Sequence, residues 1–154
     1  MKKVLLAVDN CKGSEQAVQA LAGWAKGFQP ESVLLIHVER LYGPSIVGEA
    51  LESELDIEEV TAALEGSEYL EKLDAESARI VSHFTDVLKK AGYRNVESVI
   101  KKGHPAEQII DTAKEEGVDL IVMGSRGRRQ HSFLLGSVSR EVTNTADISV
   151  LVVR

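Results

Sequence analysis

The chain has 154 residues, of which 44% are hydrophobic and 27% charged, with a formal net charge of -6. This length suits one domain that buries roughly 70% of its unfolded surface without metal or disulfide support. The composition excludes a disordered or fibrous chain. The negative charge argues against general nucleic-acid binding, which needs many phosphate contacts from Lys and Arg. No apolar run is long enough to span a bilayer, so we expect no membrane partner.

Cys11 is the only cysteine, so the chain cannot form an internal disulfide. A chain without an internal disulfide is typical of a reducing compartment, and we therefore expect a cytoplasmic protein. Cys11 lies close to the start of a predicted helix. Its thiol is either a small buried group or a reactive one with a lowered pKa.

Short runs rich in Leu and β-branched residues alternate with helical patterns along the chain. Because the runs VLLAV, VLLIHV and ISVLVV are continuously apolar, they suit parallel strands covered on both faces. The sequence therefore predicts an α/β fold, a doubly wound (Rossmann-like) five-stranded parallel sheet with helices on both faces. The predicted strands are residues 3–8, 32–39, 96–101, 118–123 and 148–153.

Four segments have apolar residues at helical spacing. Gly92 directly follows the second segment, as expected for the residue after a helix C-terminus. Pro105 suits the first position of the third helix, where its missing N–H costs nothing. The predicted helices are residues 14–26, 70–91, 105–113 and 134–146, the last with a start that could fall one or two residues later.

Residues 40–67 are long for a plain connection. Residues 49–78 carry eleven acidic side chains and one basic side chain, that of Lys72. The segment 40–67 is either an acidic helix or lid, or a solvated surface insertion without a chemical role. We expect residues 1–154 to form a single domain that contains this insertion.

The stretch from Gly124 to Ser139 has the composition of a phosphate-binding turn. Gly124 and Gly127 follow an apolar strand, and Gly136 precedes a predicted helix whose first N–H groups have no partner within the helix. Residues 124–140 also carry four arginines and no acid. The sequence therefore predicts an anionic ligand at this turn. The spacing matches neither a P-loop nor the dinucleotide fingerprint.

Asp9 ends the first predicted strand, and Gly124 ends the fourth. Ligands of open parallel sheets bind at the carboxyl ends of strands, where the strand order reverses. If the first and fourth strands are neighbours, Asp9 can accept hydrogen bonds from ribose while the glycine turn binds phosphates. The alternative is that Asp9 only caps the helix that follows it.

Four motifs resemble the universal stress protein family across nearly the whole chain. They are VDNCKGSEQAVQAL, IHVE, GHPAEQII and MGSRG with the later GSVS. The resemblance implies the strand order 3-2-1-4-5 and, in the ATP-binding branch, an adenine nucleotide at the carboxyl end of the sheet. It further implies a regulatory protein of the stress response with at most slow ATP hydrolysis and no assigned catalytic residue.

The family's nucleotide contacts can be transferred to matching positions of this chain. Asp9 is expected to bind ribose, three apolar residues to line the base and the others to surround the phosphates, with Mg²⁺ or Mn²⁺ as a possible bridge between them. Eight residues separate Gly127 from Gly136, one fewer than is usual in the family, so ADP or AMP is an alternative to ATP. The expected contacts are Ala7, Asp9, Val38, Met123, Gly124, Arg126, Gly127, Gly136, Ser137, Val138 and Ser139.

The last strand, Ile148 to Val153, is an apolar edge strand in the implied order. An unprotected edge strand can pair with a strand of another molecule. The resemblance implies that two copies pair in this way and form a homodimer through the last strand. The alternative is an edge covered by the chain's own loops. A second possible function is a dimeric interaction protein of the same fold that binds no nucleotide.

Overall fold

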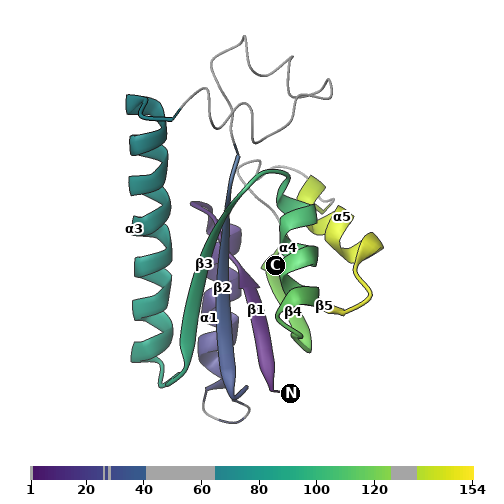
Figure 1. Ribbon diagram of the computed structural model, residues 1–154. Coiled ribbons are helices and arrows are strands. Elements are labelled where there is room, and N and C mark those ends of the chain that lie inside the picture. The colour runs from purple at the N-terminus through teal and green to yellow at the C-terminus, as the bar shows by residue number, and fades with distance from the viewer. Residues whose placement is uncertain (1, 26, 28, 41–64, 126–134) are drawn as a thin grey trace.

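The computed structural model describes residues 2–25, 27, 29–40, 65–125 and 135–154 (Figure 1). Within them, five strands form one sheet in the order β3-β2-β1-β4-β5, and each neighbouring pair is parallel. This confirms the predicted fold class and strand order. The strands are β1 Lys3–Ala7, β2 Ser32–Glu39, β3 Val96–Lys102, β4 Leu120–Gly124 and β5 Ser149–Val153.

Helices cover both faces of the sheet, as predicted. Helices α1 (Lys12–Trp24) and α3 (Glu68–Lys90) pack on one face, and α4 (Pro105–Glu115) and α5 (Ser137–Thr145) on the other (Figure 1). Each face buries its own hydrophobic cluster, so the central strands β1, β2 and β4 are buried on both sides. This double burial explains why their sequences are continuously apolar.

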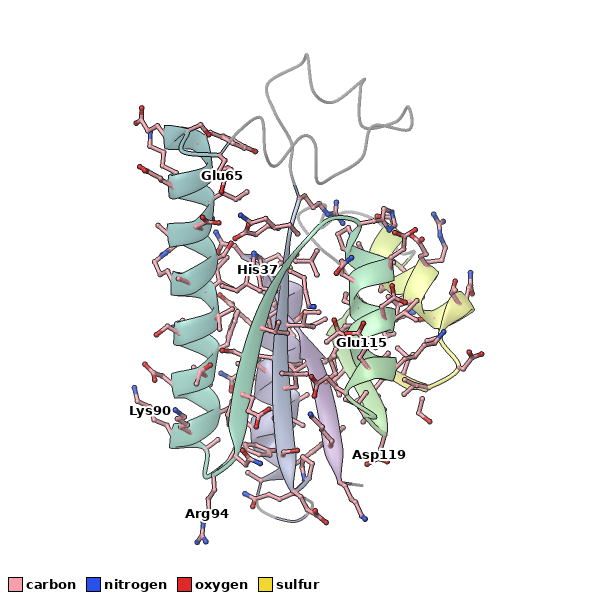
Figure 2. The ribbon with its side chains drawn as sticks, viewed as in Figure 1. His37, Glu65, Lys90, Arg94, Glu115 and Asp119 are labelled. Carbon is pink, nitrogen blue, oxygen red and sulfur yellow. The ribbon has the colours of Figure 1, made fainter. Side chains whose placement is uncertain are left out.

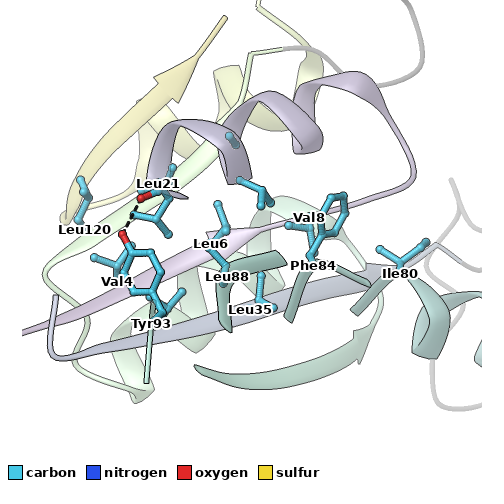
Figure 3. Packing of buried hydrophobic residues seen from close by; sticks show 14 residues of the cluster. Val4, Leu6, Val8, Leu21, Leu35, Ile80, Phe84, Leu88, Tyr93 and Leu120 are labelled. Carbon is cyan, nitrogen blue, oxygen red and sulfur yellow. Dashed lines mark hydrogen bonds between the residues drawn. The ribbon is translucent and has the colours of Figure 1, made fainter. Parts of the chain in front are cut away.

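The end of α3 is fixed by backbone geometry and by a tyrosine. Gly92 has a φ of +108° and donates to Lys89 O, while the N–H of Tyr93 donates to Leu88 O, which is the Schellman arrangement. The buried Tyr93 hydroxyl then donates to Leu21 O of α1 at 2.6 Å (Figure 3). This bond connects the C-terminus of α3 to α1 over the hydrophobic cluster that both helices cover. The predicted role of Gly92 is confirmed.

Most predicted boundaries differ from the structure by one to three residues, and two of the differences have a clear cause. β4 begins at Leu120 because the N–H of Val118 closes the end of α4 by donating to Ala113 O. α5 begins at Ser137 with Gly136 as its N-cap, three residues later than the first predicted start.

Most of the acidic segment, residues 41–64, lies outside the described residues. Among the described residues, no helix has both the length and the apolarity needed to cross a bilayer.

A buried carboxylate lies where β2, β3 and α3 meet. Glu39 ends β2 and is only 1% exposed, yet neither of its carboxylate oxygens accepts a hydrogen bond from the described residues. Its charge is balanced by Lys102, whose Nζ lies 3.5 Å from Glu39 Oε2 and donates to Asp74 Oδ1 at 2.9 Å. The bond to Asp74 raises the pKa of Lys102, so the ammonium stays charged. Because a buried charge is costly without a partner, Lys102 stabilises this corner.

The two ends of the sheet are easily distinguished (Figure 2). Asp119 precedes β4 at the amino end, where its carboxylate accepts hydrogen bonds from the N–H groups of Lys2 and Lys3. Near the opposite end, the Nδ1 atom of buried His37 lies 2.8 Å from Val8 O and links β2 to β1. The carboxyl end therefore carries Val8, His37 and Glu39, and Asp9 follows directly.

The variant Lys102→Met is expected to lower the free energy of unfolding by about 1 to 3 kcal/mol, because it leaves the Glu39 charge buried without a partner. Chemical denaturation at pH 7 measures the change. Lys101→Met is the matched control, since Lys101 is the preceding residue of the same strand, and it is expected to cost less than about 0.5 kcal/mol. Equal losses in the two variants would show that the charge on Lys102 has no special role.

Candidate functional site

The tips of β1 and β4 lie side by side. Ala7 pairs with Met123 in the register of the two strands, and the N–H of Val8 continues β1 by donating to Ile36 O of β2 at 2.9 Å. Asp9 therefore follows β1 at the carboxyl end of the sheet, where Gly124 ends β4. The strand order also reverses between these two strands, since β1 leads to β2 and β3 on one side and β4 leads to β5 on the other.

The carboxylate of Asp9 is held by the first turn of α1. Ser14 Oγ donates to Asp9 Oδ1 at 2.6 Å and accepts the N–H of Asp9 at 2.8 Å. The thiol of Cys11 also donates to Asp9 Oδ1, at 2.6 Å. Cys11 itself occupies the N-cap position, and no side chain caps α1. The alternative in which Asp9 serves only as a helix cap therefore does not describe this carboxylate.

The environment of Cys11 is unfavourable for a reactive thiolate. Burial raises the pKa of the thiol, and the hydrogen bond to Asp9 and the negative charge of Asp9 raise it further. Although a helix start commonly lowers a thiol pKa, the adjacent carboxylate acts in the opposite direction here. Cys11 is therefore a protonated donor to Asp9.

Gly124 is required by packing. A Cβ atom at this position would overlap the backbone of Gly13 in α1, with the Gly13 Cα at 2.7 Å. The missing side chain of Gly124 thus lets the first turn of α1 lie directly against the tip of β4. In the structure α1 approaches Gly124. The contact between Gly124 and a ligand that the sequence predicts stays a prediction.

The turn from β4 to α5 is closed at its base by backbone hydrogen bonds. Ser125 N donates to Val153 O at 2.7 Å, and Gly136 N donates to Ser125 O at 2.8 Å. The buried hydroxyl of Ser139 lies 3.0 Å from both Ser125 O and Gly136 O and shares its one proton between these carbonyls. Ser139 therefore fixes the start of α5 against the end of β4.

The first turn of α5 has N–H groups without an acceptor among the described residues. The first intrahelical bond runs from Arg140 N to Gly136 O at 2.9 Å, so the N–H groups of Ser137, Val138 and Ser139 precede the regular hydrogen bonds of the helix. Ser137 is exposed, whereas Val138 packs partly against the hydrophobic cluster under α4 and α5. This helix start carries the partial positive charge that favours an anion.

Ala7, Val38 and Met123 come from three adjacent strands and share one face of the sheet. All three belong to the hydrophobic cluster under α4 and α5, with Ala7 and Met123 buried and Val38 partly exposed. Ala7 pairs with Met123 and lies two residues before Asp9 in the chain. Arg126 and Gly127, which the sequence also proposes as phosphate contacts, lie outside the described residues.

The described residues contain no group of three or more His, Cys, Asp or Glu side chains that could hold a metal ion. We assign no step to a metal.

The sequence reasoning missed Ser14 as a partner of Asp9. A serine five residues after a carboxylate, in the first turn of a helix, was the available signal, because that turn folds back over the strand end. Glu39 was missed too. Its position at the end of an apolar strand gave no sign that Lys102, far away in sequence, would be its partner.

The fold and the site define a class of protein, a doubly wound α/β protein with a polar site at the switch point of its sheet. The model of the universal stress protein family matches residues 1–154. The chain is 31% identical over 156 aligned residues to the universal stress protein YxiE of Bacillus subtilis, covering 99% of this chain and 98% of that protein. The chain belongs to the universal stress protein family.

Solved structures agree with this assignment. The universal stress protein MJ0577 of Methanocaldococcus jannaschii is 31% identical to the chain, and its structure gives a TM-score of 0.76 over 99% of this chain and 94% of that one. A universal stress protein of Archaeoglobus fulgidus, solved in complex with dAMP, is 20% identical and gives a TM-score of 0.60 over 100% of this chain and 98% of that one. At that identity the second likeness concerns the fold alone.

The variant Gly124→Ala is expected to destabilise the protein by about 2 to 4 kcal/mol, because the new methyl group meets the backbone of Gly13 and cannot be relieved by a side-chain rotation. Gly23→Ala is the control, because Gly23 lies in α1, the helix that contains Gly13. No atom lies within 4 Å of a Cβ at Gly23, so this change is expected to be neutral or to stabilise by up to about 1 kcal/mol. Thermal and chemical denaturation compare the two, and a harmless Gly124→Ala would contradict the packing role.

Proposed function

We propose that this protein binds an adenine nucleotide, ATP or the related ADP or AMP, at the carboxyl end of β1 and β4. Occupancy of the site would act as a regulatory signal in the cytoplasm, with at most slow hydrolysis. The observation that carries the proposal is the placement of the Asp9 carboxylate at the switch point of the sheet, where β4 leads by a closed turn to the open start of α5.

The polar groups at the carboxyl end of β1 and β4 are complementary to the parts of a nucleotide. A carboxylate accepts the hydrogen bonds that ribose hydroxyls donate. The open N–H groups at Ser137 and Val138 suit phosphate oxygens, because a helix start offers both donors and a favourable dipole. Ala7, Val38 and Met123 lie on one face of the sheet, and we propose that they contact the base.

Two further observations support the proposal. The dAMP complex of the Archaeoglobus fulgidus relative indicates that this architecture can accommodate an adenine nucleotide. The segment that joins β4 to α5 carries Arg126, Arg128 and Arg129 and no acid, which favours phosphate over a neutral ligand. We propose Arg126, Gly127 and Gly136 as further phosphate contacts on the basis of sequence, with Mg²⁺ or Mn²⁺ bridging the phosphates.

The variant Ser137→Glu is expected to weaken ATP binding at least tenfold, about 1.4 kcal/mol, because it places a negative charge where the phosphates are proposed to lie. Isothermal titration calorimetry measures the affinity. An acidic residue in the first turn of a helix is favourable, so the thermal stability of this variant is not expected to fall.

Ser137→Gln is the control, because Gln has about the size of Glu but no charge. It is expected to change the affinity for ATP less than threefold. If Ser137→Glu binds ATP as well as the unchanged protein does, α5 does not contact the phosphates. If the unchanged protein binds no adenine nucleotide even at millimolar concentration, the proposed function is wrong.

We propose that two copies associate through β5. This strand is at the edge of the sheet, and its residues Val150 to Val153 are apolar and only partly buried. The opposite edge, β3, carries Glu97, Lys101 and Lys102, and charged residues are a common protection of edge strands. The lack of charge along β5 therefore favours β5 over β3 as the surface for a second copy.

Val153→Lys is expected to shift the protein from dimer to monomer in sedimentation equilibrium at micromolar concentration, because it places a charge in the proposed contact. Ile100→Lys in β3 is the matched control. Ile100 is 38% exposed at the other edge, so its replacement is expected to leave the mass unchanged. A monomeric unchanged protein would remove this proposal.

A further inference from the structure

The two oxygens of the Asp9 carboxylate have different surroundings. Oδ1 accepts hydrogen bonds from both Ser14 Oγ and the Cys11 thiol. Ser14 is 4% exposed, and its hydroxyl also accepts the N–H of Asp9, so the serine has little freedom to turn away. Oδ2 has no hydrogen-bond partner among the described residues.

A carboxylate oxygen has two lone pairs, and two donors already use those of Oδ1. The raised pKa of Cys11 keeps the thiol protonated, so it remains a donor near neutral pH. A ligand can therefore bind Asp9 only through Oδ2, unless it displaces the first turn of α1. That displacement is opposed by the close packing of Gly13 against Gly124.

We propose that Asp9 recognises a single ribose hydroxyl through Oδ2, and that Cys11 and Ser14 are the positioning residues that impose this limit. This inference rests on the proposed function and adds a specificity to it. The site accepts adenine ribonucleotides and nucleotides that lack either the 2′- or the 3′-hydroxyl, and it rejects those that lack both.

The physical reason is the geometry of a vicinal diol. The 2′- and 3′-hydroxyls lie on the same side of ribose and can donate to the two oxygens of a carboxylate, one each. The lone pairs of a single oxygen diverge, so Oδ2 aligns well with only one of the two hydroxyls. Either hydroxyl can fill that role, because a small rotation of the sugar exchanges them.

The test is calorimetric titration of the full chain with ATP, 2′-deoxyATP, 3′-deoxyATP and 2′,3′-dideoxyATP at one ionic strength. We expect the two monodeoxy nucleotides to bind within about threefold of ATP. The dideoxy nucleotide is expected to bind at least tenfold more weakly, because the charged Oδ2 then lacks its donor.

The double variant Cys11→Ala, Ser14→Ala tests the positioning residues. It frees Oδ1, so both oxygens can bind the diol, and ATP is expected to exceed each monodeoxy nucleotide by about fivefold or more. A purely structural role would weaken all four nucleotides by the same factor and leave their ratios unchanged. Cys11→Ser retains a donor and is expected to keep the ratios of the unchanged protein.

The outcomes separate the inference from the function on which it rests. A loss above tenfold for either monodeoxy nucleotide, or equal binding of ATP and the dideoxy nucleotide, overturns the inference while ATP binding stands. Unchanged ratios in the double variant remove the role of Cys11 and Ser14. No heat of binding with ATP itself overturns the proposed function, and the inference fails with it.

Discussion

The contact on which the candidate site depends is the approach of α1 to the tip of β4 through Gly13 and Gly124. It brings the first turn of the helix over the carboxyl end of the sheet, and Cys11 and Ser14 reach the Asp9 carboxylate from that turn. A side chain at Gly124 would separate the helix from the strand, because its Cβ would overlap the backbone of Gly13. The orientation of Asp9 is thus a consequence of backbone packing between segments more than a hundred residues apart.

Most of the buried polar side chains among the described residues lie near the same end of the sheet, namely Ser14, His37, Glu39, Ser125 and Ser139. Glu39 is charge-paired with Lys102 where β2 and β3 meet α3, and His37 is bonded to the backbone of β1. Such groups cost free energy unless they are satisfied, so their partners fix the relative positions of strands and helices there. This local rigidity is what a binding site at the strand ends requires, since a ligand gains most from groups that are already in place.

The sequence predicted the fold well because its strongest signals are local. The apolar strands, the apolar helix stripes and the glycine after α3 depend on neighbouring residues, and each was confirmed. The helix boundaries were less accurate, as with α5, whose start at Ser137 is set by Gly136 bonding to Ser125 across the turn. The positions of Asp9 and Gly136 in the site were proposed from the strand order and from family resemblance, and nucleotide binding there remains a proposal.

The sequence by itself determined the α/β class, the alternation of strands and helices, and the presence of a carboxylate and a glycine-rich turn at two strand ends. Periodicity and residue type are enough for those features, since each depends on a short stretch of chain. Only the tertiary structure decided that Gly124 faces Gly13, that Ser14 and Cys11 share one oxygen of Asp9, and that Lys102 balances Glu39. These are contacts between particular atoms, and the shape of the folded chain sets which atoms meet.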